Sequence, residues 1–68
     1  MPVITMTLGA DQIDQQKKSA FIETVTKCAS EITNIPEQSF IVFIEQLDSD
    51  NIGVGGVSLT EKRKLRAS

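Results

Sequence analysis

The segment that most constrains the fold is residues 40–44, where Phe, Ile, Val, Phe and Ile follow one another with no polar residue between them. β-Branched and aromatic residues favour extended structure, and a strand that is apolar on both sides must be covered on both sides. A chain of 68 residues has little other material for this purpose. The sequence therefore predicts a buried strand within a single domain, residues 1–68, and part of its cover must come from another copy of the chain.

A second extended segment, residues 3–8, lies near the amino terminus. Its residues alternate, so that Ile4, Met6 and Leu8 share one face while Val3 and two threonines share the other. A period of two with this β-branched content is typical of a strand. Two strands separated by a helix form a crossover unit, and we therefore expect the two strands to be parallel.

The segment between the two strands has helical periodicity. From residue 14 to residue 33 apolar side chains recur at intervals of three and four residues, which predicts one amphipathic helix. Either Asp11 or Asp14 is suited to cap its amino terminus, and Asn34 followed by Pro36 ends it. The predicted apolar stripe comprises Phe21, Val25, Cys28, Ala29 and Ile32. The predicted solvated face, with no special chemistry, comprises Lys17, Lys18, Glu23, Lys27 and Glu31.

The rest of the chain is polar or rich in glycine. Residues 45–47 close the second strand, residues 48–51 read as a polar turn, and residues 52–57 read as a small hairpin. Residues 61–66 carry four positive charges and one negative, a net +3 that leaves −5 for residues 1–60. We interpret this end as a solvated tail, the alternative being a source of cations for an anionic ligand or a neighbouring subunit. The expected fold is α/β (α+β): one β-α-β unit with a short C-terminal hairpin.

Composition excludes several classes of protein. Cys28 is the single cysteine and there is no histidine, so neither a disulfide framework nor an ordinary zinc or haem site is expected within one chain. No metal or cofactor is predicted, and self-association remains as the source of extra stability. The net charge of −2 gives no reason to expect nucleic acid, and an apolar run of five residues is too short for a membrane span. We interpret Cys28 as a core residue rather than a nucleophile, in a reducing cytoplasm.

The pair Met1-Pro2 carries the most chemical information. A small second residue generally permits removal of the initiator methionine, which would leave Pro2 with a free secondary amine. An α-amino group titrates near pH ~8 in model peptides, and apolar surroundings lower that value because they disfavour the charged form. Such an amine is suited to act as a general base in a chain without histidine. The alternative is a purely structural role, in which Pro2 only stiffens the start of a strand.

Four features together resemble the 4-oxalocrotonate tautomerase family along almost the whole chain. They are Met1-Pro2 followed at once by a strand, Asp-Gln-Gln-Lys at residues 14–17, Pro36 before the second strand, and Asn-Ile-Gly-Val-Gly-Gly at residues 51–56. The resemblance implies a homohexamer or a related assembly with active sites built from more than one subunit. It also implies that Pro2 transfers a proton within a small-molecule enol or keto acid.

The same resemblance indicates which residues bind the substrate and where the chain departs from the family. Family members of the type enzyme have one arginine in the turn before the helix, where this chain has residues 10–12 without arginine, and another at the position of Ile41. A lost charge-assisted donor costs about 2–4 kcal/mol of transition-state stabilisation. Where the family pocket has an aromatic residue as one wall, this chain has Ile52. Arg63 matches a family arginine near the carboxyl terminus. The expected substrate-binding residues are Arg63, Ile41, Ile52, Leu8 and Ser39.

Three functional readings follow. The first is an isomerase, a keto–enol tautomerase for an enol or 2-keto acid that is smaller or more apolar than a dicarboxylate. The second, motivated by the two missing arginines, is a weak or inactive oligomer that binds a ligand or has a structural role. The third is another activity based on an amino-terminal proline, such as hydration or dehalogenation of an unsaturated acid.

Overall fold

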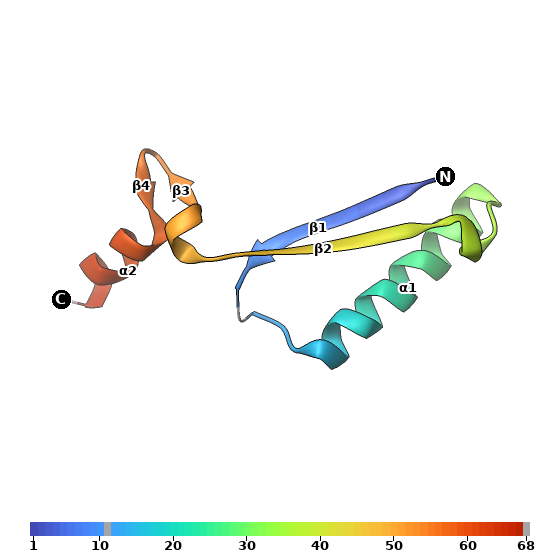
Figure 1. Cartoon of the computed structure of the whole chain (residues 1–68), viewed down its shortest axis with the longest axis horizontal. Helices are drawn as coiled ribbons and strands as arrows, with labels where there is room; N and C mark the ends of the chain where they lie inside the picture. The colour runs from blue at the N-terminus through green and yellow to red at the C-terminus, as the bar shows by residue number, and fades with distance from the viewer. Residues whose placement is uncertain (11, 68) are drawn as a thin grey trace.

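The computed structural model describes residues 1–10 and 12–67, so Asp11, one of the two candidate caps, lies outside the described residues. Strand β1 (Val3–Gly9) pairs with strand β2 (Ile41–Leu47), and the two are parallel, in register from Val3 opposite Ile41 to Gly9 opposite Leu47. Helix α1 (Gln15–Thr33) connects them and runs back along the sheet (Figure 1). The predicted β-α-β unit with parallel strands is therefore confirmed.

Both ends of α1 are fixed by the residues that the sequence indicated. The Asp14 carboxylate accepts a hydrogen bond from the Lys17 backbone N–H at 2.9 Å, the usual contact of an amino-terminal cap. Asn34 takes the left-handed conformation, with φ of 61°, and its N–H donates to the Ser30 carbonyl at 2.9 Å. Asp14 is thus a cap, and the helix stops where Asn34 and Pro36 predicted.

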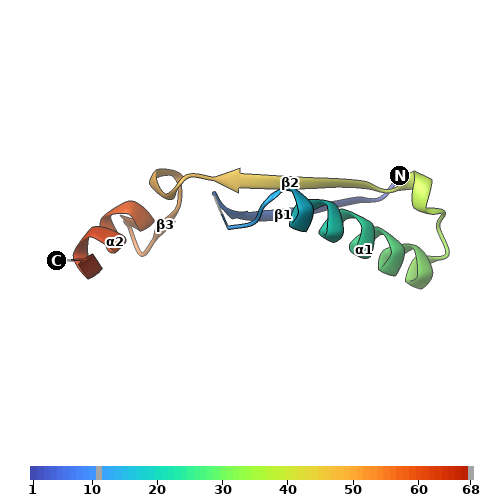
Figure 2. The ribbon, with the colours of Figure 1, turned by 90° about the horizontal axis from the view of Figure 1, so that it is seen from below.

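The two faces of the sheet differ in their cover. Ile4, Met6 and Leu8 are half-buried, as are Val42 and Ile44, which lie beside them in the register and share their face with α1. The opposite face is open, with Val3 54% exposed and Phe43 53% exposed. Figure 2 shows α1 lying along one side of the two strands. One helix covers one face, as the sequence predicted.

The second strand is displaced from its predicted bounds. Phe40 lies before β2, because its N–H donates to the Glu37 carbonyl at 3.1 Å and closes the short 3-10 turn Glu37–Ser39. At the other end the strand continues to Leu47, because β1 offers backbone partners as far as Gly9. The Thr7 hydroxyl also donates to the Glu45 carboxylate at 3.2 Å. Pairing with β1, rather than hydrophobicity, therefore sets the end of β2.

The residues after β2 form a second small unit, which we call the arm (residues 49–67). It contains a 3-10 turn (Ser49–Asn51), strands β3 (Gly53–Val54) and β4 (Val57–Ser58) paired antiparallel, and helix α2 (Leu59–Ala67). Gly55 and Gly56 have φ of 63° and 86°, conformations that other residues rarely adopt, which explains the glycine pair in the tight turn. The predicted hairpin is confirmed.

The helical tail was not predicted. The basic segment belongs to α2, although Arg63 and Lys64 are exposed as expected of a solvated end. The helix begins because the Ser58 hydroxyl accepts the Glu61 backbone N–H at 3.2 Å, half of a capping box. The Thr60 hydroxyl also donates to the Asp50 carboxylate, which holds the helix against the preceding turn.

The interpretation of Cys28 as a core residue was wrong for the single chain. The helix face that lies against the sheet carries Phe21, Val25 and Ala29, which recur every fourth residue and are half-buried. Cys28 falls on the flank of that face and is exposed, and Ile32 beside it is 77% exposed. The apolar stripe is therefore wider than the surface that one two-stranded sheet covers.

The chain by itself is extended rather than compact. Its principal extents are 51 × 25 × 14 Å and its radius of gyration is 16.1 Å, against ~11 Å for a compact domain of this length. Its accessible surface is 5265 Å², against ~4,200 Å² for a folded monomer of its mass. None of the residues whose burial is described is fully buried. A single copy thus does not close a hydrophobic core.

Candidate functional site

Three of the predicted site residues lie together at the amino ends of the strands. The Ile41 backbone N–H donates to the Pro2 carbonyl at 3.0 Å, which fixes Pro2 at the start of the sheet. Pro2, Ile41 and Ser39 are all half-buried, and Ser39 lies two residues before Ile41 at the end of the 3-10 turn. The place of the candidate base is thus set by β1–β2 pairing.

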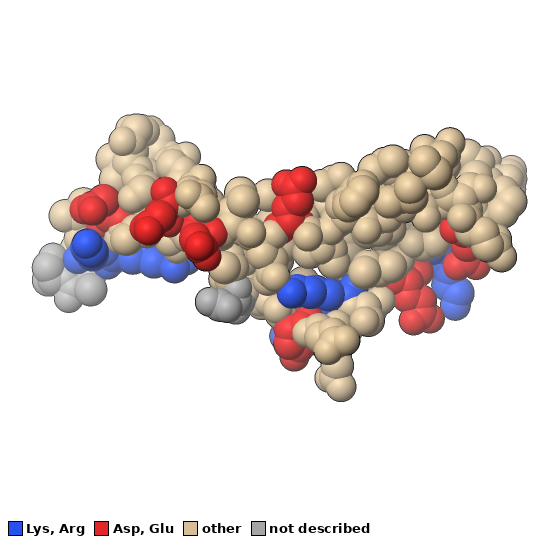
Figure 3. Space-filling view, in the orientation of Figure 1, with Lys and Arg blue, Asp and Glu red and all other residues tan. Residues whose placement is uncertain are grey.

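The segments beside Pro2 are uncharged. Neither residues 1–10 nor residues 38–44 include a charged side chain. In Figure 3 the surface over this part of the two strands has the colour of uncharged residues, while acidic and basic side chains gather on the arm and along α1. The two segments that meet at Pro2 therefore carry no side-chain charge.

The other predicted site residues lie elsewhere in the chain. Leu8 is six residues from Pro2 along an extended strand, or ~20 Å at the usual rise per residue. Ile52 and Arg63 belong to the arm, which projects from the opposite end of the molecule in Figure 1. One copy therefore brings together Pro2, Ser39 and Ile41, and it does not bring Leu8, Ile52 or Arg63 to them.

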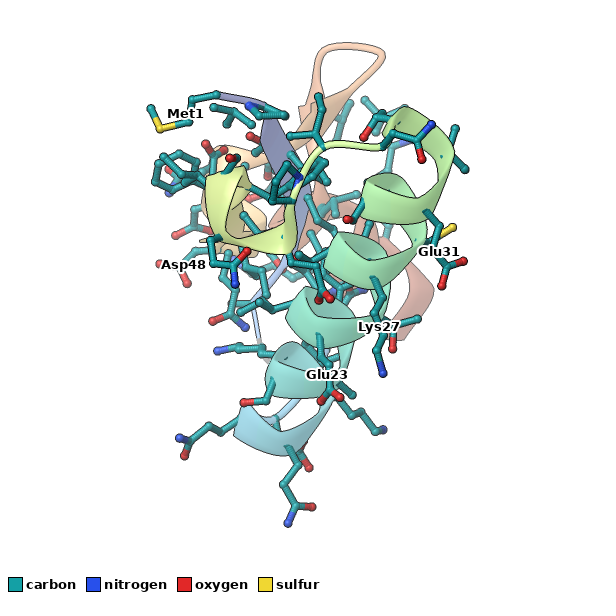
Figure 4. All side chains as sticks on the ribbon, turned by 90° about the vertical axis from the view of Figure 1, so that its right-hand side faces the viewer. Met1, Glu23, Lys27, Glu31 and Asp48 are labelled. Atoms are coloured by element: carbon teal, nitrogen blue, oxygen red, sulfur yellow. The ribbon has the colours of Figure 1, made fainter. Side chains whose placement is uncertain are left out.

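The position of Lys18 differs from the one that its sequence pattern predicted. It was placed on the solvated face of α1, but it is half-buried and its ammonium donates to the Gln46 side-chain oxygen at 2.6 Å. Figure 4 shows that Glu23, Lys27 and Glu31 do lie on the outer side of the helix, as predicted. The signal was available, because Lys18 precedes Phe21 by three residues and so shares its face.

The described part of the chain encloses no cavity and holds no group of three acidic, cysteine or histidine side chains arranged for a metal. No helix in that part combines the length and apolarity needed to cross a bilayer. The candidate site is therefore an open surface at the end of a sheet.

Comparison with known proteins agrees with this arrangement. Residues 2–62 match the family described as tautomerase enzyme. Over 62 residues the chain is 39% identical to a probable tautomerase of Bacillus cereus, covering 91% of this chain and all of the relative. It is 33% identical over 61 residues to the 2-hydroxymuconate tautomerase of Bacillus subtilis (strain 168), covering 90% and 97% of the two chains.

A solved structure extends the likeness to three dimensions. TomN, a 4-oxalocrotonate tautomerase homologue in the tomaymycin biosynthetic pathway, superposes with a TM-score of 0.81 at 30% identity, covering 93% of this chain and 95% of that one. Fold and sequence together define a small protein of the tautomerase fold. The chain belongs to the tautomerase enzyme family, which supports an isomerase function of the tautomerase kind and confirms the resemblance drawn from its motifs.

Proposed function

We propose that the chain is a keto–enol tautomerase in which Pro2, freed by removal of Met1, is the general base. The observation that carries this proposal is the position of Pro2, half-buried at the start of β1 and tied through its carbonyl to Ile41. Family membership supplies the reaction class. The substrate is an enol or 2-keto acid, and no cofactor takes part.

The proposed chemistry needs one proton carrier. The neutral amine of Pro2 accepts the hydroxyl proton of the enol as the carbonyl forms, and the resulting ammonium returns a proton to carbon. The O–H bond breaks, a C–H bond forms, and the amine is regenerated without any redox change. Because no charged side chain occurs in residues 1–10 or 38–44, the proposal needs burial among uncharged groups, rather than a neighbouring cation, to favour the neutral amine.

We further propose that the working form is an oligomer, with a homohexamer expected from the family resemblance. The open sheet face with Val3 and Phe43 and the excess surface of the single copy support association. A two-fold axis perpendicular to the strands would pair like strands antiparallel, so that the amino end of one sheet would lie beside the carboxyl end of another. Leu8, Ile52 and Arg63 would then reach Pro2 from neighbouring copies.

The composition of this pocket favours a small or apolar acid. Ile41 and Ile52 supply apolar walls, Ser39 supplies a hydroxyl, and Arg63, exposed on α2, supplies a cation from the arm. Ile41 occupies a position where the type enzyme of the family has an arginine. A dicarboxylate would thus lack part of its binding, whereas a monocarboxylic keto acid needs one cation. The unpaired Cys28 is consistent with a reducing cytoplasm as the setting.

The second candidate function is a weak or inactive family member that binds a ligand or has a structural role. This second function is favoured by Ile41, whose apolar side chain stands where the type enzyme of the family has an arginine. Tautomerisation of phenylpyruvate separates the two readings, since a binding protein leaves the uncatalysed rate unchanged.

The first experiment is the intact mass of protein purified from its native host. Loss of Met1, together with turnover of phenylpyruvate or 2-hydroxymuconate, is the expected result. A mass that includes Met1 would show that the Pro2 nitrogen is an amide without basicity, and this result would overturn the proposal.

A further inference from the structure

A polar cluster lies at the carboxyl ends of the two parallel strands, away from Pro2 of the same copy. Its centre is the Lys18 ammonium, which reaches from the first turn of α1 to the Gln46 side-chain oxygen at 2.6 Å. Gln46 stands opposite Leu8 in the strand register. Lys18 is half-buried there, whereas its neighbour Lys17 is exposed.

The charge of Lys18 is not matched by an acid within the described chain. An ammonium has three N–H donors, and the contact to Gln46 uses one of them on a neutral amide. The single ion pair among the described residues joins Lys64 and Glu61, in α2. A half-buried cation whose partner is uncharged retains the capacity to bind an anion.

A second amide stands at the same edge of the sheet. The Gln12 side-chain oxygen accepts the Gly9 backbone N–H at 3.2 Å, and the side chain folds across Gly9, where its amide carbon lies 3.5 Å from the place a Cβ would take. The amide nitrogen of Gln12 remains a donor. Gln12, Gln46 and Lys18 thus lie together at the carboxyl ends of the two strands.

We propose that Lys18 binds the carboxylate of the substrate, with Gln46 positioning its ammonium. The inference rests on the proposed function, because the two-fold pairing proposed above would place this edge beside Pro2 of another copy. The ligand is the carboxylate of a 2-keto acid or its enol, and Lys18 would contact it together with the Arg63 cation of the arm. Lys18 would thereby supply from the helix a positive charge, which neither the turn before α1 nor the position of Ile41 provides.

The test compares phenylpyruvate with its uncharged methyl ester in two matched variants. Lys18→Met keeps the aliphatic stem and removes the charge, and Lys17→Met makes the same change one residue away on the exposed side. In Lys18→Met the KM for phenylpyruvate should rise roughly 10- to 100-fold, as expected for loss of a charge-assisted hydrogen bond. The KM for the ester should stay near its wild-type value, and Lys17→Met should change neither. Lys18→Arg should retain most of the affinity for the acid.

Direct binding separates this inference from the role of Pro2. By calorimetry, Pro2→Ala should bind phenylpyruvate even where it turns over little, and Lys18→Met should bind it weakly or not at all, with sedimentation confirming that each variant assembles. If the wild-type protein binds phenylpyruvate through Lys18 but catalyses nothing, the proposed function fails and the carboxylate site stands. The assignment of Lys18 would be overturned if Lys18→Met raised the KM for the acid and the ester equally, or if Lys17→Met raised the KM for the acid as much as Lys18→Met does. Failure of the wild-type protein to bind phenylpyruvate would also overturn it. Should Lys18→Met not fold, Lys18→Gln against Lys17→Gln decides the same question.

Discussion

The backbone N–H of Ile41 donates to the carbonyl of Pro2 at 3.0 Å, so the residue just before β1 and the residue that begins β2 are joined directly. Their positions are set by main-chain atoms, which a change of side chain leaves in place. Substitutions at either residue therefore report on local chemistry more than on the arrangement of the sheet.

Replacing Pro2 tests the general base. In Pro2→Ala the rate of phenylpyruvate tautomerisation should fall by about 10²-fold or more, because positioned acid–base groups contribute about 10²–10⁴-fold. The measurement is kcat/KM by absorbance, on protein whose mass shows removal of Met1. Equal rates in wild-type and variant protein would assign the activity to another group.

Assembly depends on the open face of the sheet. Phe43 is 53% exposed in the single copy, and a charge placed there should prevent its burial against another copy. We expect Phe43→Lys to sediment as a monomer or unfolded chain at micromolar concentration, where the wild-type protein shows no folded monomer. Glu23→Lys, on the outer side of α1 in Figure 4, is the matched control and should assemble normally. A stable, cooperatively folded wild-type monomer would contradict the proposal.

The cation of the arm is tested at Arg63. In Arg63→Ala the KM for an acidic substrate should rise, and kcat should also fall if the contact strengthens in the transition state. Neutral substrates should be affected little. The control is Lys64→Ala, which removes the adjacent exposed cation. Small and equal changes for both substrate types would show that Arg63 belongs only to a solvated surface.

Restoring a charge at β2 provides the complementary test. Ile41→Arg should gain activity towards 2-hydroxymuconate, because the added guanidinium can pair with the second carboxylate of that substrate. Some loss of stability is expected from partly burying a charge at a half-buried position. A well-folded, assembled Ile41→Arg protein with no gain would indicate that the chain shares the fold of the family and not its site.

The sequence by itself determined the elements that depend on neighbours in the chain. Asp14 and Asn34 mark the two ends of α1, because capping contacts span three or four residues. The pair Gly55 and Gly56 turns the hairpin, because its conformation is a property of those residues alone. The motif beginning at Pro2 was enough to indicate the family. Helix α2 was missed although Ser58 and Glu61 carry a local capping signal.

Only the tertiary structure decided what depends on segments far apart in the sequence. β2 runs on to Leu47 because β1 supplies hydrogen-bond partners that far, which the hydrophobicity of residues 40–44 does not reveal. The partner of Lys18 was likewise decided by the fold, because Gln46, on a different element, lies within reach of its ammonium. Pro2 and Arg63 lie far apart because β1 and β2 are parallel, so that Pro2 stands at their amino ends while the arm with Arg63 continues from the carboxyl end of β2 (Figure 1). Such distances follow from packing between elements, and packing is not a local property of the sequence.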